Sequence, residues 1–280
     1  MLRLLISFCL ILGLGACGSS EKKEEIVQEP MKKEEASKKD NAEAKPEMKK
    51  EPVEKATHWS YKGAFGPQFW GNLDTKYELC KSGKQQSPID LVWKRPKKSG
   101  SLVEIAYKET ALKTMDSGHS IVYPVDPGSL LMHNGKAYDL KMFHFHSPSE
   151  HSLSGKNFPL EMQLVHIAQD GQFSIVSVFF KEGAENAMLA KMWANIPAEK
   201  KQVKVDNDFL YTPSVLLPNA KTHYNYIGSL TAPPCSENVN WIVMNTPLEA
   251  SKAQIDAYKA LYKDNNRPTQ SLGGRDYNNY

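Results

Sequence analysis

The chain has 280 residues, with 35 Lys and Arg against 32 Asp and Glu, which gives a formal net charge of +3. This near-balance argues against nucleic-acid binding, because a protein that grips phosphates carries a large basic excess. We therefore expect a surface of mixed charge and no nucleic-acid partner.

Residues 1–17 have the pattern of a bacterial lipoprotein signal peptide. A basic start at Arg3 precedes an apolar run over 4–14 that is too short to span a bilayer as a helix. The run ends in a lipobox-like sequence at Cys17, so we predict cleavage before Cys17 and a lipid on it. The alternative is a plain secretory signal with a chance cysteine. In both cases we expect an extracytoplasmic protein, and in the first it is anchored to a bacterial membrane, on the periplasmic side or the cell surface.

Residues 18–57 consist mostly of Lys, Glu, Ala and Pro, with almost no large apolar side chain. Such a segment cannot bury enough apolar surface to offset the entropy of ordering it. Pro30, Pro46 and Pro52 would interrupt any helix that formed. We predict a disordered tether that holds a folded domain, residues 58–280, away from the membrane.

Cysteines in the predicted domain are limited to Cys80 and Cys235. An even pair in an oxidising compartment favours a disulfide, so we predict a bond between these residues. Its loop would span most of the domain, and closing so long a loop stabilises the fold by restricting the unfolded chain. Two independent free thiols are the alternative.

Short β-rich runs dominate the domain, whereas helical patterns are scarce. The expected strands cover residues 120–123, 138–146, 160–169, 173–180 and 240–244. Helices are expected over 184–195 and over 251–262, where Ser251 and Gln254 form a capping-box pair. We therefore predict a mainly β (α+β) fold, in which peripheral short helices flank a large twisted, mostly antiparallel sheet.

Two histidines on one strand form the strongest functional signal. Side chains on a strand alternate between faces, so His144 and His146 share a face and have aromatic residues behind them. Two imidazoles on one side of a strand supply most of a catalytic zinc site. The strand over 160–169 carries Glu161 and Gln163 on a single face. If that face meets the histidines, Gln163 occupies the position of a third ligand.

These residues form part of a pattern that resembles the α-class carbonic anhydrases, including bacterial lipoprotein-type members. The matching pieces are Gln86-Ser87-Pro88-Ile89-Asp90, Gly118-His119, Phe143-His144-Phe145-His146, Glu150-His151, Gly228-Ser229-Leu230-Thr231-Ala232-Pro233-Pro234-Cys235, Trp241 and Asn266-Arg267-Pro268. The resemblance implies a twisted central sheet of about ten strands. It also implies zinc-dependent, reversible hydration of carbon dioxide to bicarbonate and a proton.

The resemblance also implies a role for each matching residue. His144 and His146 correspond to two zinc ligands, and Gln163 takes the place of the third, where the family has His. A Gln carbonyl oxygen is a weaker zinc donor than imidazole, so we expect reduced affinity. Glu161 corresponds to the carboxylate behind the third ligand, and it could accept a hydrogen bond from the Gln163 amide.

The remaining correspondences concern catalysis and the substrate. Thr231 and Glu150 match the pair that orients the attacking hydroxide, and His119 matches the proton shuttle. Val165, Ile175, Leu230 and Trp241 match the apolar wall that receives carbon dioxide, and Tyr61 matches a cavity tyrosine.

Two further residues bear on the metal ligands. Met142 is a departure from the family, which often has an amide residue there, bonded to the first ligand. His166 could replace Gln163 as a ligand only through a β-bulge, because strand parity sends it to the opposite face. We therefore expect His166 to be packed or hydrogen-bonded elsewhere.

The sequence leaves two main hypotheses open. The first is a membrane-tethered carbonic anhydrase, a lyase, whose activity is reduced by Gln163; side activity on small esters is compatible with it. The alternative is an acatalytic carbonic-anhydrase-like lipoprotein that uses the same cavity or its rim as a binding module. The expected partners are carbon dioxide, bicarbonate and a membrane through Cys17. No protein partner is predicted.

Overall fold

The computed structural model describes residues 58–97 and 101–280. The predicted signal peptide (1–17), the lipid site at Cys17 and the tether (18–57) lie outside the described residues. Among the described residues, no helix is both long and apolar enough to cross a membrane.

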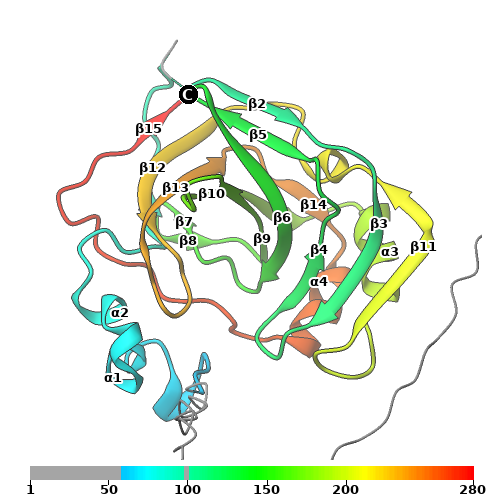
Figure 1. Cartoon of the computed structure of the whole chain (residues 1–280), viewed down its shortest axis with the longest axis horizontal. Coiled ribbons are helices and arrows are strands. Elements are labelled where there is room, and N and C mark those ends of the chain that lie inside the picture. Colours follow the sequence, from blue (N-terminus) through cyan, green and yellow to red (C-terminus); the bar gives the residue numbers. More distant parts are fainter. Residues whose placement is uncertain (1–57, 98–100) are drawn as a thin grey trace, which may run out of the picture. The chain divides into compact units, whose positions relative to one another are not determined.

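A sheet of 12 strands dominates the described domain (Figure 1). Its main path runs β11-β3-β4-β6-β9-β10-β13-β12-β15. Off this path, β14 pairs with β10, β5 pairs with β6, and β2 pairs with β5. The strands of this sheet are β2 (Val103–Ala106), β3 (Thr110–Asp116), β4 (Ile121–Pro124), β5 (Leu130–His133), β6 (Lys136–His146), β9 (Leu160–Ala168), β10 (Phe173–Glu182), β11 (Val203–Tyr211), β12 (His223–Ser229), β13 (Glu237–Met244), β14 (Leu248–Ala250) and β15 (Asn278–Asn279). A small second sheet contains β1 (Asp90–Leu91), β7 (Ser152–Leu153) and β8 (Lys156–Asn157).

The predicted fold class is confirmed, with two refinements. The main sheet has more strands than the expected ten or so, and it is mixed, because β10 runs parallel to both β13 and β14. The other pairings of the main sheet are antiparallel, including the hairpin between β9 and β10. Gly171 turns that hairpin at φ 83°, a left-handed conformation that favours glycine.

Helices are short and few in the described residues. They are α1 (Trp70–Leu73), α2 (Leu79–Ser82), α3 (Ala187–Ala194) and α4 (Lys252–Leu261), with 3₁₀ turns η1 (Gly63–Phe65), η2 (Thr75–Tyr77) and η3 (Pro213–Leu216). Both helices predicted from the sequence are present, as α3 and α4. The predicted capping box also forms: the Ser251 side chain accepts from the Gln254 backbone N–H, and the Gln254 side chain accepts from the Ser251 backbone N–H.

A buried cluster of aromatic side chains packs against one face of β6. Phe143 and Phe145 are completely buried, and Tyr123 of β4 stacks on Phe143. Trp193 of α3 and Tyr258 of α4 contact Phe145. The helices thus cover the face of the sheet that carries the phenylalanines, while the histidines of β6 point to the opposite face. A rigid strand with one face packed in this way fixes the direction of its other side chains.

Candidate active site

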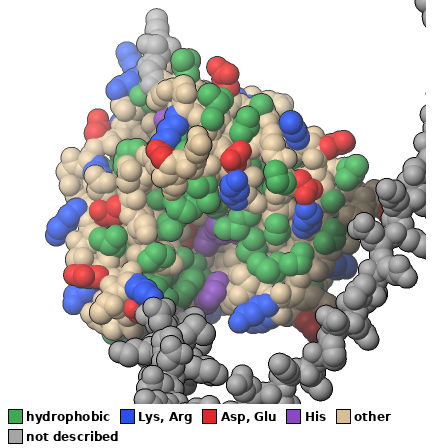
Figure 2. Space-filling view, viewed as in Figure 1, with side chains coloured by type: hydrophobic (Ala, Val, Ile, Leu, Met, Phe, Trp, Pro, Cys, Tyr) green, Lys and Arg blue, Asp and Glu red, His purple; other side chains and the backbone are tan. Residues whose placement is uncertain are grey.

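His144 and His146 lie at the end of β6, and their ring centroids are 4.9 Å apart. In the pairing of β6 with β9, His144 stands opposite Gln163 and His146 opposite Glu161. Directly opposed residues of an antiparallel pair share a face of the sheet. The expected meeting of Gln163 with the two histidines is therefore confirmed. Figure 2 shows histidine side chains near the middle of one face, bordered by hydrophobic side chains.

The Gln163 side chain is anchored by two carboxylates. Its Nε2 donates to Glu150 Oε2 at 2.8 Å and to Glu161 Oε1 at 3.1 Å. The bond to Glu161 is the one that the sequence predicted. Both hydrogens of the amide are thus used by acceptors, and this fixes which end of the amide is nitrogen.

The Gln163 side chain also acts on His144 through a hydrogen bond. Burial, followed by the neighbouring His146, lowers the pKa of His144 to about 3, and Glu161 and a hydrogen bond with Gln163 act in the opposite direction. A hydrogen bond that raises a histidine pKa must come from an acceptor, and the acceptor of the Gln163 amide is Oε1. His144 is therefore neutral at neutral pH, as a metal ligand must be.

Each histidine has one buried ring nitrogen with no hydrogen-bond partner in the described residues: Nδ1 of His144 and Nε2 of His146. His146 Nδ1 lies 2.6 Å from the backbone oxygen of Asn265, to which it donates, so Nε2 keeps a free lone pair. Glu150 Oε2 lies 3.5 Å from this Nε2. The unpartnered Nδ1 of His144 agrees with the presence of Met142, which offers no amide oxygen to it.

Glu161 is the centre of a buried network. Its Oε1 accepts from Ser177 Oγ at 2.7 Å and from His151 Nδ1 at 2.8 Å, and its Oε2 accepts from the backbone N–H groups of Glu150 and His151. Burial alone would raise the pKa of Glu161, but these partners, His151 foremost, lower it to about 2. The carboxylate is therefore ionised and holds the Gln163 amide.

His151 and Ser177 are site residues that the sequence reasoning missed. His151 appears in the Glu150-His151 motif without an assigned role, yet its Nε2 meets Tyr226 Oη at 2.8 Å. Ser177 stands opposite Gln163 in the pairing of β10 with β9. The sequence offered one signal for Ser177: it lies two residues after Ile175, and residues two apart on a strand share a face.

Glu150 is completely buried, and its carboxylate is held from two sides. Oε1 accepts from the backbone N–H of Arg267 at 2.9 Å, and Oε2 accepts from Gln163. Within the described residues, the hydrogen bonds of this carboxylate go to these two partners rather than to Thr231. Thr231 is itself buried, at 6 % exposure.

His119 lies in the turn between β3 and β4, where its ring stacks on Trp59 with centroids 3.8 Å apart and planes 5° apart. Burial lowers the pKa of His119 below its ordinary 6.5, and the charges of His58, Lys200 and Lys201 lower it further. Trp59 was missed as a neighbour because nothing in the sequence links it to a turn so far along the chain.

Tyr61 lies between the amino-terminal segment and the histidines. Its ring centroid is 6.4 Å from that of His146, and it also contacts Trp59. Burial, and next the charge of Glu150, raise the pKa of Tyr61 well above 10.0, so the hydroxyl keeps its proton. Tyr61 therefore lies beside a candidate metal ligand, and its role as a cavity tyrosine stays a prediction.

The predicted apolar wall runs across three adjacent strands. Val165 of β9 stands opposite Ile175 of β10, and Ile175 is paired with Trp241 of β13. Trp241 is completely buried, and its Nε1 donates to the Ser229 backbone at 2.9 Å, just before Leu230. Strand parity predicted that Val165 shares a face with Gln163, and the register adds Ile175 and Trp241 beside it.

His166 does not join the site. Its Nε2 meets Tyr107 Oη at 2.8 Å, and its Nδ1 lies 3.2 Å from the backbone oxygen of Ser174. The pairing of β6 with β9 does shift register between Leu140 and Met142, but this bulge leaves His166 on the opposite face. The expected alternative, a hydrogen-bonded buried histidine, is confirmed.

The donor set that remains consists of two imidazoles and one amide oxygen. No group of three His, Cys, Asp or Glu side chains is arranged to hold a metal ion in the described part of the chain. This follows from the third position being Gln163. The lone pair of His146 and the anchored amide of Gln163 nevertheless fit a three-donor site, and its single oxygen ligand would make it weaker than three histidines.

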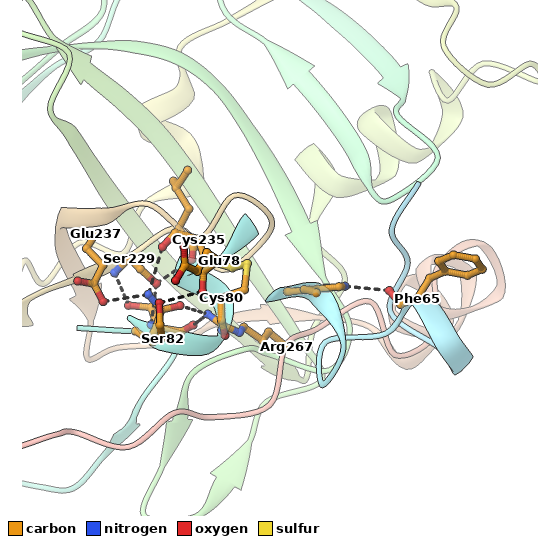
Figure 3. The surroundings of a disulfide bond; sticks show 12 residues. Phe65, Glu78, Cys80, Ser82, Ser229, Cys235, Glu237 and Arg267 are labelled. Carbon is orange, nitrogen blue, oxygen red and sulfur yellow. Dashed lines mark hydrogen bonds between the residues drawn. A yellow bond between two sulfur atoms is a disulfide. The ribbon is translucent and has the colours of Figure 1, made fainter. Parts of the chain in front are cut away.

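The predicted disulfide joins Cys80 of α2 to Cys235, across a sequence separation of 155 (Figure 3). Arg267 lies beside it and donates to the Cys80 backbone oxygen at 2.9 Å and to Gln86 Oε1 at 2.8 Å. The same residue donates its backbone N–H to Glu150. The covalent link therefore supports the segment that positions an active-site carboxylate.

Comparison with known proteins agrees with this geometry. Residues 65–278 match the family model of eukaryotic-type carbonic anhydrases. The carbonic anhydrase of Pectobacterium carotovorum is 38% identical over 224 residues, covering 79% of this chain and 90% of the relative. That of Neisseria gonorrhoeae is also 38% identical, covering 78% and 86%.

Solved structures give the same result. The α-carbonic anhydrase of Thermovibrio ammonificans, solved with the inhibitor sulfanilamide, has a TM-score of 0.76 and 40% identity, covering 80% of this chain and 99% of that one. Dioscorin, solved in complex with ascorbate, has a TM-score of 0.72 and 32% identity, covering 80% and 98%. The chain therefore belongs to the alpha-type carbonic anhydrase family.

Proposed function

We propose that this protein is a zinc-dependent carbonic anhydrase of reduced activity, in which Gln163 replaces a histidine ligand. Membership of the family implies the reversible hydration of carbon dioxide. One observation carries the finer proposal: the carboxylates of Glu150 and Glu161 hold the Gln163 nitrogen, so its oxygen is directed towards His144.

His144, His146 and Gln163 would hold the zinc ion. When bound, zinc supplies a positive charge that makes water a nucleophile at neutral pH. The ionised Glu161 keeps the Gln163 amide from flipping, a role that supporting residues behind metal ligands commonly play. Affinity is lowered because an amide oxygen is a poorer zinc donor than imidazole, and because Nδ1 of His144 finds no acceptor among the residues that the structure describes.

The other residues act on the nucleophile, the proton and the gas. Thr231 orients the attacking oxygen towards carbon dioxide, which rests against the wall formed by Val165 and Trp241. Glu150 is held by the Arg267 backbone and by Gln163 in the described residues, so it acts on this oxygen by fixing the Gln163 amide rather than by accepting from Thr231. His119, half-buried and stacked on Trp59, accepts the released proton and passes it to solvent.

The proposal includes a location. The lipobox-like sequence ending at Cys17 supports a lipid anchor, and the Lys/Glu-rich segment 18–57 supports a flexible spacer. The enzyme would then work outside the cytoplasm at a bacterial membrane. Mass spectrometry of the membrane fraction tests this, because a diacylated amino-terminal Cys17 is expected and an unmodified one would contradict the anchor.

The enzymatic proposal is tested on the purified domain, residues 58–280, with and without added zinc. We expect substoichiometric metal after purification, binding of one zinc at raised concentration, and carbon dioxide hydration in stopped flow that depends on that zinc. A domain that stays metal-free and inactive at saturating zinc would overturn the proposal.

A second candidate is an acatalytic binding module, and two observations favour it. In the described residues no trio of the usual ligand side chains is arranged for a metal, and the similar dioscorin was solved with ascorbate. A metal-free cavity that binds a small polar molecule would explain both. Calorimetry of chelator-treated protein with ascorbate tests it: saturable binding that Gln163→His or added zinc abolishes supports the module, and no heat of binding removes it.

A further inference from the structure

A second group of polar side chains lies outside the active site, where Ser101, just before β2, meets the end of β5 and the start of β12. It surrounds a cavity of about 370 Å³ whose lining includes Lys97, Ser101, Lys221 and His223. No step of carbon dioxide hydration uses these residues.

Ser101 lies between two imidazole rings. Its Oγ is 2.9 Å from His223 Nε2 and 3.2 Å from His133 Nε2. His223 Nδ1 lies 2.8 Å from the backbone oxygen of Lys221, which can only accept, so this nitrogen carries the ring proton. In the neutral ring Nε2 is then an acceptor, and the Ser101 hydroxyl donates to it.

The second ring has the opposite tautomer. His133 Nδ1 lies 3.1 Å from the amide nitrogen of Asn240, which also donates to Ser174 Oγ at 2.7 Å, so Nδ1 is an acceptor. His133 Nε2 therefore carries the proton and donates to Ser101 Oγ, the nearer of its two neighbours. The Ser101 oxygen thus accepts a hydrogen bond from His133 and donates its own proton to His223.

Burial supports this arrangement. His223 and His133 are only 3 % and 8 % exposed, whereas Ser101 is half-buried at the cavity. Burial lowers the pKa of His223 despite the bond to the Lys221 backbone, and burial together with the charge of His223 lowers that of His133. The base is consequently unprotonated at neutral pH. The Tyr280 ring, 5.7 Å away, packs on the His223 ring.

We propose that Ser101 is the nucleophile of a second reactive site, with His223 as its general base, and that this site takes small esters whose acyl part is anionic. A nucleophile bonded to a base that a third group orients is the signature of an activated serine. Lys97 and Lys221 are lining residues, and their positive charges favour negative charge on the acyl donor, although the Lys221 ammonium also donates to the Pro218 backbone oxygen at 2.8 Å.

The reaction needs no redox partner. Ser101 Oγ bonds to the acyl carbon while its proton moves to His223 Nε2, and that proton leaves with the alcohol as the ester C–O bond breaks. Water, deprotonated by His223, then attacks the acyl-serine and releases the carboxylic acid with Ser101 restored. His133 stabilises the serine oxygen by its hydrogen bond and is a positioning residue.

The test uses the full chain, treated with a chelator so that metal-dependent ester hydrolysis cannot contribute. An alkyl fluorophosphonate is the probe, and peptide mapping by mass spectrometry locates the adduct. We expect one adduct on Ser101, its loss in Ser101→Ala, and a labelling rate about 100-fold lower in His223→Gln, the usual scale for a lost general base.

Ser82→Ala is the matched control, because the exposed Ser82 hydroxyl donates to the backbone oxygen of Glu78 and meets no imidazole within residues 58–97 and 101–280. It should label at the unaltered rate. The proposal is overturned if Ser101 stays unlabelled in the wild-type chain, or if a folded His223→Gln variant is labelled at the wild-type rate. Neither outcome bears on the proposed zinc site at Gln163. The wild-type mapping decides even if Ser101→Ala fails to fold.

The substrate class is tested separately with two activated esters. Mono-4-nitrophenyl succinate should acylate Ser101 faster than 4-nitrophenyl acetate, and inorganic phosphate should slow it by competing for the same cations. Faster acylation by the neutral ester would overturn the preference for anionic acyl donors.

Discussion

The amide nitrogen of Gln163 donates to the Glu150 carboxylate at 2.8 Å, so a hydrogen bond joins the proposed third ligand to the carboxylate proposed to act beside it. Both oxygens of Glu150 are then committed, one to Gln163 and one to the Arg267 backbone. A histidine at position 163 would leave the first of these oxygens to a different donor. The substitution therefore affects the proposed metal site and the orientation of the nucleophile together.

Gln163→His is the most direct test of the metal site. Imidazole is a stronger zinc donor than an amide oxygen, and even the loss of a supporting residue costs about 10–100-fold in metal affinity. We expect the zinc dissociation constant, measured by competition with a chromophoric chelator, to fall by more than about 100-fold and hydration to rise. Gln163→Ala is the control and should bind less zinc than the wild type. An unchanged affinity in the histidine variant would show that residue 163 is not a ligand.

Met142→Gln addresses the orphaned nitrogen of His144. Nδ1 of His144 is buried without a hydrogen-bond partner in the described residues, and an amide two residues earlier on the same strand face could accept from it. We expect zinc affinity to rise about 10-fold, measured in the same competition assay. Met142→Leu, which adds no acceptor, should behave as the wild type; an equal gain in this control would mean that packing, not the hydrogen bond, is responsible.

Glu161 should make folding stability depend on acid pH. Its pKa is about 2 in the folded protein against 4.5 for a free side chain, so the folded state binds fewer protons between these values. Its contribution, on the order of 3 kcal/mol, is present above pH 4.5 and is lost as the pH falls towards 2. Urea unfolding at several pH values measures it. Glu161→Gln should flatten this dependence, and a variant with the wild-type slope would contradict the prediction.

The sequence predicted most of the site because strand periodicity is a local property. Parity alone put His144 with His146 and Glu161 with Gln163, and the antiparallel register brought the two pairs together. It also correctly excluded His166. These predictions needed no knowledge of which strands lie further away.

Contacts that depend on distant pairings could not be predicted. Ser177 reaches Glu161 only because β10 lies beside β9 in one particular register, and Trp59 meets His119 through folding of the amino-terminal segment. The parallel pairing of β10 with β13 likewise has no local signal, since a long connection separates the two strands. The edge strand β11 was missed because its exposed, polar-rich sequence lacks a buried face.

The disulfide should be a large part of the stability of the domain. The chain-entropy model gives about 4–5 kcal/mol for closing a loop as long as that between Cys80 and Cys235. Cys80→Ala/Cys235→Ala should therefore lower the unfolding temperature, measured by calorimetry, by about 10–20 °C. The wild type under reductant should match the double variant. A loss of less than about 1 kcal/mol would mean that the hydrogen bonds of Arg267 hold this region without the covalent link.

Trp59 and His119 allow the proton-transfer step to be tested apart from metal binding. In the hydration direction His119 must be unprotonated to accept a proton, so turnover in weak buffer rises with pH through its pKa. Since burial and the nearby positive charges lower that pKa, the midpoint should fall below 6.5. His119→Ala should reduce this turnover about 10-fold or more and recover it with added imidazole. Trp59→Ala removes the stacked ring and part of the burial, so its midpoint should move back towards 6.5. Wild-type turnover in His119→Ala would mean that another group carries the proton.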